Sequence, residues 1–147
     1  MNPLRKLSVH LCLTAALILS LAACGHEAVP VSVPEFWQQT SVGGSFEVTL
    51  DPQTDEKVEM NEFLEWVVTV ATPDGEPVAP ARITVGGGMP AHGHGLPSQP
   101  KISDHPEAGK YLLKGLKFSM NGQWVIELDI QSESIRDTVK FDIALDF

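Results

Sequence analysis

Apolar and polar residues alternate along most of the chain that follows Gly44. In the first such stretch Phe46, Val48 and Leu50 are separated by polar residues. A period of two is typical of a β-strand that buries one face and exposes the other, and no segment sustains the 3.6-residue repeat of an amphipathic helix. The pattern therefore predicts an all-β protein, with strands expected at residues 46–50, 64–70, 83–85, 111–113, 116–120, 124–130 and 139–147.

Turn signals separate several of these stretches. Pro73-Asp74-Gly75 and Gly109 interrupt the alternation, and Asn121-Gly122 is a dipeptide typical of a tight hairpin turn. We therefore expect a hairpin between strands at 116–120 and 124–131. A set of about seven short antiparallel strands predicts an immunoglobulin-like β-sandwich, although the paired cysteines of antibody domains are absent. The acidic stretch at 51–61 is expected to form a loop or a short helix.

The first 23 residues have a different character. Arg5 and Lys6 precede an apolar run that ends at Ala23, and this run is shorter than the about 20 helical residues that span a bilayer. A basic start followed by a short apolar run predicts a signal peptide over residues 1–23. Leu21-Ala22-Ala23-Cys24 also resembles the lipobox of bacterial lipoproteins, in which cleavage precedes the cysteine and the thiol is then acylated.

We therefore expect a lipoprotein anchored through Cys24. Several acyl chains on one cysteine hold a protein at a membrane without a spanning helix. This predicts the membrane as a partner and the bacterial cell envelope as the location, with the domain in the periplasm. Gly25 resembles the residue that follows the cysteine in outer-membrane lipoproteins of Gram-negative bacteria.

Between this anchor and the alternating region lies a segment with two prolines and a Gly43-Gly44 pair. It shows little periodicity, so residues 24–44 are expected to form a lipidated tether. Phe36 and Trp37 interrupt its simple composition, and their large apolar area is expected to dock on the domain. The β-sandwich domain itself is expected at residues 45–147.

Charge and cysteine content narrow the possible partners. The chain has 19 acidic and 10 basic residues, which gives a formal net charge of −9. Nucleic-acid binding needs clustered Lys and Arg, so no nucleic-acid partner is expected. The two cysteines are Cys12, inside the predicted signal peptide, and Cys24, the predicted lipid attachment site. The predicted domain therefore has no thiol for catalysis or for metal binding.

Residues 86–100 are the most unusual segment, because they hold five glycines and three prolines. A long segment of this composition is expected to be a functional surface loop. Its first six residues match the G-x-G-x-x-A pattern of dinucleotide-binding proteins. That interpretation fails, since Gly93 and Gly95 exclude the helix that must follow and no β-α-β pattern surrounds the match.

The same segment carries side chains that bind metals. In extended backbone His92 and His94 would point the same way about 6–7 Å apart, with Gly93 and Gly95 leaving the space open. Met89 adds a thioether. Imidazole suits copper, zinc and nickel, thioether favours Cu(I), and a structural zinc site would need thiolate. Copper is therefore the expected metal, although the spacing equally allows a flexible surface loop that binds nothing.

Two further residues have open roles. Met120 shares its parity with Leu116 and Phe118, which predicts a buried residue, yet its place at the end of a predicted strand also allows it to ligate a metal. His105 lies in Ser103-Asp104-His105-Pro106, where we expect a loop and an ordinary surface residue.

Three motifs together resemble those of the YtkA-like and FixH-like domain families. They are Gly88-Met89-Pro90-Ala91-His92-Gly93-His94-Gly95, Gly109-Lys110-Tyr111 and Phe118-Ser119-Met120-Asn121-Gly122-Gln123-Trp124. The resemblance covers about residues 63–147. It implies a small immunoglobulin-like domain of the bacterial envelope, associated with copper handling that includes supply to respiratory oxidases. The ligands that it implies are Met89, His92, His94 and Met120. Relatives often carry a histidine where this chain has Ser119, so that ligand is missing here.

Two functions follow from these observations. The first is a lipid-anchored envelope protein that binds copper, as Cu(I), and delivers it to or receives it from another envelope protein, or buffers it. The second is a structural or interaction module in which the loop contacts protein rather than metal. No enzyme is expected, because the chain lacks a nucleophile elbow, an H-E-x-x-H motif and a P-loop lysine.

Overall fold

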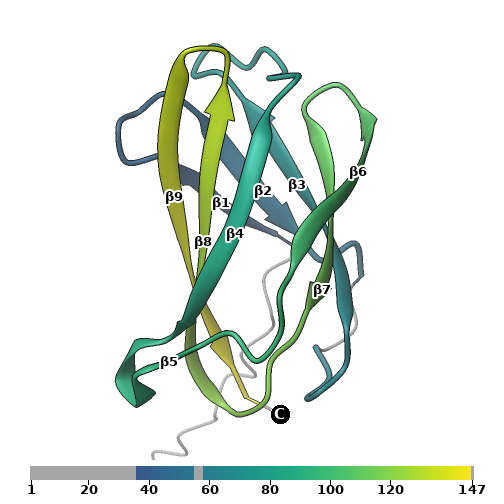
Figure 1. Cartoon of the computed structure of the whole chain (residues 1–147), viewed down its shortest axis with the longest axis vertical. Helices are drawn as coiled ribbons and strands as arrows, with labels where there is room; N and C mark the ends of the chain where they lie inside the picture. Colours follow the sequence, from purple (N-terminus) through teal and green to yellow (C-terminus); the bar gives the residue numbers. More distant parts are fainter. Residues whose placement is uncertain (1–35, 55–57, 147) are drawn as a thin grey trace, which may run out of the picture. The chain divides into compact units, whose positions relative to one another are not determined.

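The computed structural model describes residues 36–54 and 58–146. Within these residues nine strands form two antiparallel sheets (Figure 1). The predicted signal peptide, Cys24 and the first part of the predicted tether lie outside the described residues. In the part of the chain that is described, no helix has the length and apolar character needed to cross a bilayer.

The two sheets differ in size. The five-stranded sheet has the order β1-β2-β3-β7-β6, and the four-stranded sheet has the order β5-β4-β8-β9. In chain order the elements are β1 (Trp37–Thr40), β2 (Glu47–Asp51), β3 (Leu64–Ala71), β4 (Arg82–Met89), the 3₁₀ turn η1 (Pro90–His92), β5 (His94–Gly95), β6 (Lys101–Glu107), β7 (Lys110–Leu116), β8 (Gly122–Ser132) and β9 (Ile135–Leu145).

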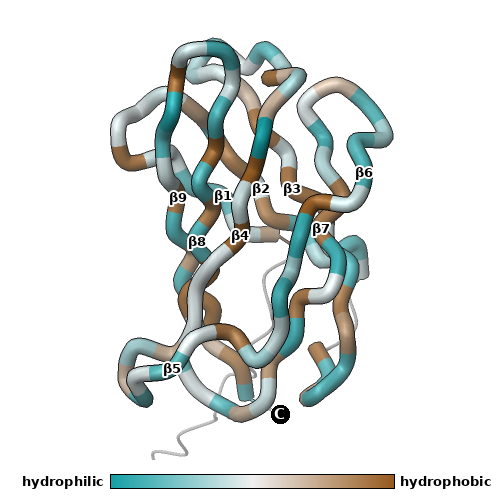
Figure 2. The backbone as a smooth tube through the Cα atoms, viewed as in Figure 1, coloured by the Kyte–Doolittle hydropathy of each residue, from teal (hydrophilic) through white to brown (hydrophobic). Residues whose placement is uncertain are grey.

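The alternating apolar residues meet between the sheets and form the core. Val48 and Leu50 of β2 are fully buried, while Thr49 between them is only half-buried. The same alternation of apolar and polar residues continues along the other long strands (Figure 2). Complete burial of one such side chain contributes roughly 1.5–3 kcal/mol. The predicted all-β antiparallel sandwich is confirmed, with nine strands where the sequence predicts about seven.

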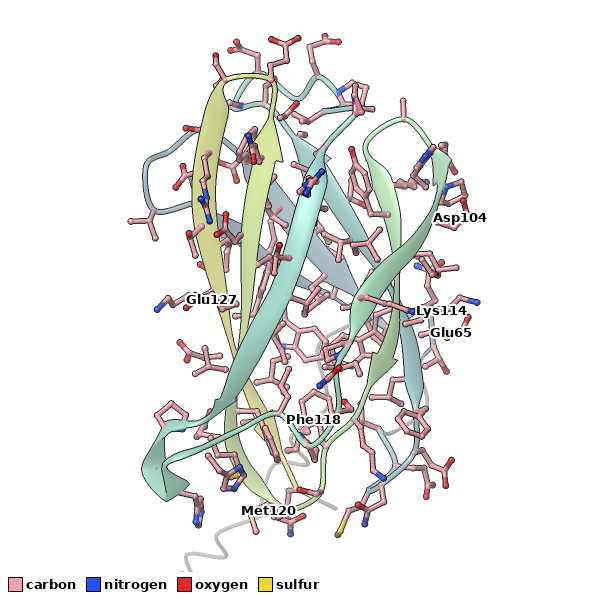
Figure 3. The ribbon with its side chains drawn as sticks, in the orientation of Figure 1. Glu65, Asp104, Lys114, Phe118, Met120 and Glu127 are labelled. Atoms are coloured by element: carbon pink, nitrogen blue, oxygen red, sulfur yellow. The ribbon has the colours of Figure 1, made fainter. Side chains whose placement is uncertain are left out.

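Charged residues on the outer faces agree with this strand register. Lys114 of β7 is paired with Glu65 of β3 at 3.0 Å, and Lys140 of β9 is paired with Glu127 of β8 at 2.8 Å. Each pair joins residues directly opposite each other in the ladder. Glu65, Lys114 and Glu127 are labelled in Figure 3. The polar half of the alternation therefore faces water, as the pattern requires.

The hairpin expected around Asn121-Gly122 is wrong. β7 ends at Leu116 and pairs with β3 and β6, whereas β8 begins at Gly122 and pairs with β4 and β9. Residues 117–121 therefore cross from one sheet to the other. Phe118 is fully buried in this crossover, with its ring 5.9 Å from that of Trp66 and 5.3 Å from that of Trp124. Because Phe118 is buried, it extends the alternation of apolar and polar residues beyond Leu116, and the pattern therefore predicts a strand where the chain forms a connection.

The hairpin that β8 does form lies at its other end. Ser132 pairs with Ile135 of β9, which leaves a two-residue turn between them. Glu133 in that turn has a φ of 51°, the left-handed conformation that two-residue hairpin turns use. The sequence of this turn contains no glycine, so the residue pattern does not predict a hairpin here.

Strand β6 occupies residues for which the sequence predicts a loop. It pairs with β7, and its ladder is irregular on both sides of Asp104. The expected loop around His105 is therefore wrong, although His105 is exposed as expected. Because β6 is an edge strand with mostly exposed residues, it has no buried stripe to reveal it. No helix is present in the described part of residues 51–61.

Strand β1 lies within the range that the sequence assigns to the tether. Trp37 stacks on Trp66 of β3, with ring centres 5.2 Å apart, so it docks on the domain as expected. Backbone pairing from Trp37 to Thr40 with β2 adds this segment to the sheet. The sheet therefore begins before Ser45, because the stacking of two large aromatic rings secures a strand that has little alternation of its own.

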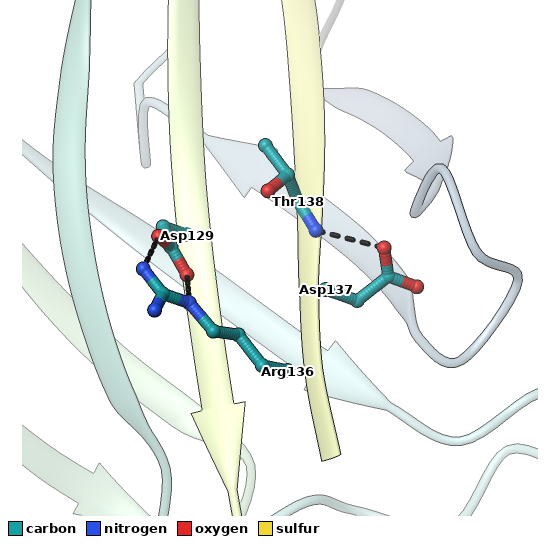
Figure 4. Close-up of polar contacts among 4 residues, drawn as sticks. All are labelled: Asp129, Arg136, Asp137 and Thr138. Atoms are coloured by element: carbon teal, nitrogen blue, oxygen red, sulfur yellow. Dashed lines mark hydrogen bonds and ion pairs between the residues drawn. The ribbon is translucent and has the colours of Figure 1, made fainter.

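Asp137 of β9 fastens the turn between β1 and β2. Its carboxylate accepts hydrogen bonds from the Ser41 hydroxyl at 2.7 Å and from the backbone N–H groups of Gly43, Ser45 and Thr138 at 2.8–3.2 Å. Burial would raise the pKa of this carboxyl, but these hydrogen bonds outweigh it and hold the pKa well below its usual range. Figure 4 shows the bond to Thr138. We call this arrangement the Asp137 clasp.

Candidate metal site

The segment with the two histidines is a tight hairpin at one end of the four-stranded sheet (Figure 1). After β4 ends at Met89, Pro90 begins a 3₁₀ turn, and Gly93 leaves it with a φ of 68°. The N–H of Gly93 donates to the carbonyl of Met89 at 3.0 Å. β5 then pairs His94 with Met89. We call residues 88–95 the histidine hairpin.

This geometry corrects two expectations. Residues 86–89 continue β4 instead of opening an irregular loop. The backbone at His92 is helical rather than extended, because proline fixes a φ that suits the first position of a helical turn. The two histidines therefore approach each other by a turn and not by the two-residue repeat of a strand.

Glycine at position 88 is required by the return of the chain. A Cβ added to Gly88 would lie 2.2 Å from the carbonyl oxygen of His94, a separation that side chains do not tolerate. The neighbouring Gly86 has open space around its Cβ position. The close approach of β5 to β4 thus depends on the missing side chain at Gly88.

Register places three important side chains in one row across the sheet. Met89 is directly opposite His94 of β5, and Gly88 is opposite Val125 of β8. The next position along β4 and β8 therefore brings Met89 level with Trp124. Directly opposite residues have their Cβ atoms about 4.5–5.5 Å apart on the same face. Met89 and His94 are thus neighbours on one face of the sheet, with Met89 buried and His94 exposed at its end.

The imidazole rings of His92 and His94 lie close to each other. Their centres are 6.0 Å apart and their planes differ by 38°. With metal–imidazole bonds of about 2.0–2.1 Å, two imidazoles on one ion have ring centres at most about 6.4 Å apart. Both residues are exposed. The pair is therefore close enough to share one ion and open enough to exchange it.

A backbone contact favours one tautomer of the neutral His94 ring. Its Nδ1 atom lies 2.9 Å from the carbonyl oxygen of Gly95. A carbonyl only accepts hydrogen bonds, so Nδ1 carries the proton in this contact. Nε2 of the neutral ring then keeps its lone pair and is the atom available to a metal.

Met89 lies beneath the pair rather than beside it in solvent. Its side chain is 1% exposed, and its methyl carbon lies 2.9 Å from where a Cβ of Gly122 would be. Glycine at position 122 therefore leaves the room that this side chain occupies. Met89 is a buried soft donor below two exposed imidazoles.

Met120 lies at the same end of the sandwich as β5 (Figures 1 and 3). It is 37% exposed, so it is not the core residue that its parity predicts. Its carbonyl accepts a hydrogen bond of 3.0 Å from the indole N–H of Trp124. Trp124 in turn lies against His94, with ring centres 5.7 Å apart. Met120 therefore belongs to the surroundings of the hairpin through Trp124.

His105 is remote from this group. It lines an open pocket with Ala79, Pro80 and Tyr111, next to the residue at which β4 begins. The hairpin follows the opposite end of β4, and eight strand residues extend about 23 Å. The structure thus brings Met89, His92 and His94 together with Met120 nearby, and it leaves His105 out.

The donor set determines which metals fit. Among residues 36–54 and 58–146, no three His, Cys, Asp or Glu side chains gather in a way that could hold a metal ion. The side chains near the two imidazoles that can add a soft ligand are the thioethers of Met89 and Met120. Two imidazoles with one or two thioethers form a soft to borderline set, which suits Cu(I) better than zinc or the hard cations.

Sequence reasoning missed two residues of this region. Trp124 alternates with polar residues like any core residue, and Gly122 looked like part of a hairpin turn. Their positions in the motif Phe118–Trp124 were visible, but the pattern alone gave them only structural roles. Their contacts with His94, Met120 and Met89 depend on the crossover between sheets, which the alternation concealed.

A comparison with protein families agrees with the motif resemblance. The model of the YtkA-like family matches residues 38–129, which is more than half of the 147-residue chain. The match begins within β1 and ends within β8, so it includes the histidine hairpin and Met120. Comparisons with curated proteins and with solved structures gave no significant match.

Proposed function

Because this chain belongs to the YtkA-like family, we propose that it is a lipid-anchored protein of the bacterial cell envelope that binds copper and delivers or buffers it. YtkA-like domains are not a known family of enzymes, and no reaction is assigned to this one. Copper is the cargo of the proposed site and not a structural cofactor. Cu(I) is the oxidation state that its thioethers favour.

One observation carries this proposal. The rings of His92 and His94 lie 6.0 Å apart at an open end of the sandwich, and Met89 is directly opposite His94 in the ladder. Here the 3₁₀ turn, Gly88 and the contact with Gly95 each contribute to the arrangement.

The exposure of the pair suits a cargo that must leave again. Both imidazoles face solvent, whereas Met89 is buried beneath them. A partner protein can therefore approach the metal from the histidine side and replace imidazole ligands one at a time. Metal in a fully enclosed site would leave only after the surrounding chain had opened.

The anchor is a separate part of the proposal. The Leu21–Cys24 motif supports acylation of Cys24, which would hold the domain at the periplasmic surface of a membrane, the outer membrane in a Gram-negative cell. Replacement Cys24→Ala should release the protein from the membrane fraction and abolish incorporation of labelled fatty acid. A C24A protein that still carries labelled fatty acid would contradict this assignment.

Copper binding is tested by competition. Detergent-solubilised mature protein is titrated with Cu(I) against a coloured Cu(I) chelator under reducing conditions, with a second titration of Cu(II) in air. The double variant His92→Ala/His94→Ala should bind Cu(I) at least about 100-fold more weakly, because both imidazole ligands are gone. His105→Ala removes an exposed histidine remote from the hairpin and should bind like the wild type.

Two results would contradict the proposal. Equal Cu(I) affinity of the double variant and the wild type would show that the hairpin is not the site. Wild-type protein that takes no copper from the chelator in either titration would favour the second function, a module that contacts other proteins.

A further inference from the structure

Trp124 contacts both parts of the proposed copper site, the histidine hairpin through His94 and the segment of Met120 through its backbone carbonyl. The histidine hairpin connects β4 to β5, whereas Met120 lies in the crossover between β7 and β8. The crossover leads into β8, which pairs with β4, so the two segments meet at one end of the four-stranded sheet. A side chain that contacts both helps to set the relation between them.

The ring of Trp124 supports His94. The two rings meet edge to face at 67°, with centres 5.7 Å apart. On its other side the indole is packed edge to face against Phe118 at 5.3 Å, and Trp124 is fully buried. A buried ring that is held by Phe118 cannot move aside, so it gives the His94 imidazole a fixed wall. The Gly95 contact then sets which nitrogen of His94 points outward.

The indole N–H of Trp124 supports Met120. It donates to the carbonyl of Met120 at 3.0 Å, and a buried indole N–H left without an acceptor would be costly. This bond fixes the backbone at Met120, while the side chain remains partly exposed. The thioether of Met120 is therefore carried on a backbone position that Trp124 determines.

From these two contacts we infer that Trp124 is a positioning residue of the copper site, which sets the distance between the His94 imidazole and the Met120 thioether. The inference rests on the proposed function and adds Met120 to the ligands of Cu(I). It predicts a specific pattern. Loss of the indole N–H should weaken the binding of Cu(I), for which thioethers are good ligands, and leave the binding of Cu(II) nearly unchanged.

The test is the replacement Trp124→Phe, which keeps an aromatic ring but removes the N–H donor. Cu(I) affinity of the mature protein should fall about tenfold, the lower end of the effect of residues that orient metal ligands. Met120→Leu should cause a similar loss. The double variant should be no weaker than Met120→Leu alone, because both changes remove the same ligand. Cu(II) affinity should change less than about twofold in all three.

Trp66→Phe is the matched control. Trp66 is also buried and also contacts Phe118, but its stacking partner is Trp37 and not a residue of the proposed copper site. The same substitution there should lower stability in the same way and leave Cu(I) affinity at the wild-type value. Equal losses of Cu(I) affinity in W66F and W124F would show a general effect of core damage and would overturn the inference.

A measurement on wild-type protein removes the risk that W124F does not fold. Cu(I) is diamagnetic, so the indole N–H signals of the three tryptophans can be followed by NMR during the titration. The Trp124 signal should shift, and those of Trp37 and Trp66 should not. The shift at saturating Cu(I) should be smaller in Met120→Leu, because only the contribution through His94 remains.

The outcomes separate this inference from the proposed function. If the wild type binds Cu(I) while its Trp124 signal stays unchanged and W124F binds equally well, the positioning role is wrong and the copper site stands. If the wild type binds no copper, both ideas fall together.

Discussion

The two ends of the four-stranded sheet treat their polar groups in opposite ways. At one end the Asp137 carboxylate accepts hydrogen bonds from four donor groups of the domain, including the Ser41 hydroxyl and the Gly43 N–H. At the other end lie the imidazoles of His92 and His94. The hydrogen bond seen there runs from Nδ1 of His94 to the backbone carbonyl of Gly95. Both ends hold groups that can bind a cation, yet only the histidine end leaves lone pairs available.

The difference explains where function is expected in this domain. A buried carboxylate with every lone pair used stabilises the fold and has no capacity left for a ligand. Two exposed imidazoles held close to each other contribute little to folding, and the His94 ring uses only its Nδ1 atom in a hydrogen bond, which leaves Nε2 for a metal. Substitutions at the Asp137 end should change stability and leave copper binding intact, and substitutions of the histidines should do the opposite.

The largest effect is expected from Asp137→Ala. It leaves several N–H groups without their acceptor in a buried place, so the free energy of unfolding should fall by about 2–4 kcal/mol. Cu(I) affinity should stay within twofold of the wild type. Urea unfolding and the chelator competition measure the two quantities. If D137A loses copper binding while it remains folded, the two ends are coupled and the comparison fails.

Asp129→Ala is the control for this change. Asp129 lies on β8, where its carboxylate forms an ion pair with the exposed guanidinium of Arg136 (Figure 4). The hydrogen bond from Arg136 lowers the pKa of Asp129 and outweighs the small effect of burial. A solvent-exposed pair contributes little to stability, so D129A should be far less destabilised than D137A.

A second effect follows from the pKa of Asp137. Its pKa is lower in the folded protein than in the unfolded chain, where it is about 3.9. The unfolded state therefore binds more protons below that value, and the clasp contributes fully near neutral pH. The difference in urea midpoint between wild type and Asp137→Asn should shrink steadily below about pH 4. A constant difference between pH 7 and pH 3 would contradict the clasp.

A smaller loss of stability is expected from Gly88→Ala. The new Cβ would lie 2.2 Å from the His94 carbonyl oxygen, so β5 must move away from β4. We expect a loss of about 1–2 kcal/mol in stability, with Cu(I) affinity lowered about tenfold, although no ligand is removed. Gly86→Ala is the control, because its Cβ has open space. Wild-type affinity in G88A would show that the hairpin does not orient His94.

The smallest effect on stability is expected from His92→Ala/His94→Ala. Both side chains are exposed, and such changes usually alter the free energy of unfolding by less than about 0.5 kcal/mol. This is the variant that should lose Cu(I) binding. Thermal unfolding in the presence of a chelator measures the stability without metal. A loss as large as that of D137A would mean that the hairpin supports the fold, contrary to the comparison.

Much of the fold is readable from the sequence because burial repeats with the strand period. Val48 and Leu50 are where the alternation predicts, and the same holds for the long strands β3, β8 and β9. The alternation fails at Phe118, which is buried between the sheets in a crossover and not in a strand. Burial is the quantity that the pattern reports, and a buried connection gives the same signal as a strand.

For the candidate site, the sequence predicts which side chains can bind a metal, but it does not predict how they are arranged. The types and spacing of Met89, His92 and His94 predict a soft metal site, and the structure brings the three together. The pattern did not give the helical turn at Pro90 or the wall made by Trp124. Both depend on how distant segments pack, which local spacing does not record.

Strand β6 has a consequence for how copies of this protein behave beside each other. Its outer edge offers unpaired backbone groups, which is the usual starting point for edge-to-edge aggregation. Lys101 and Asp104 place charges along it, Pro106 lacks an N–H to donate, and the ladder is irregular in two places. Because of these features, β6 lacks the alternation of apolar and polar residues that predicts a strand. The same features also hinder a second chain from extending the sheet at this edge.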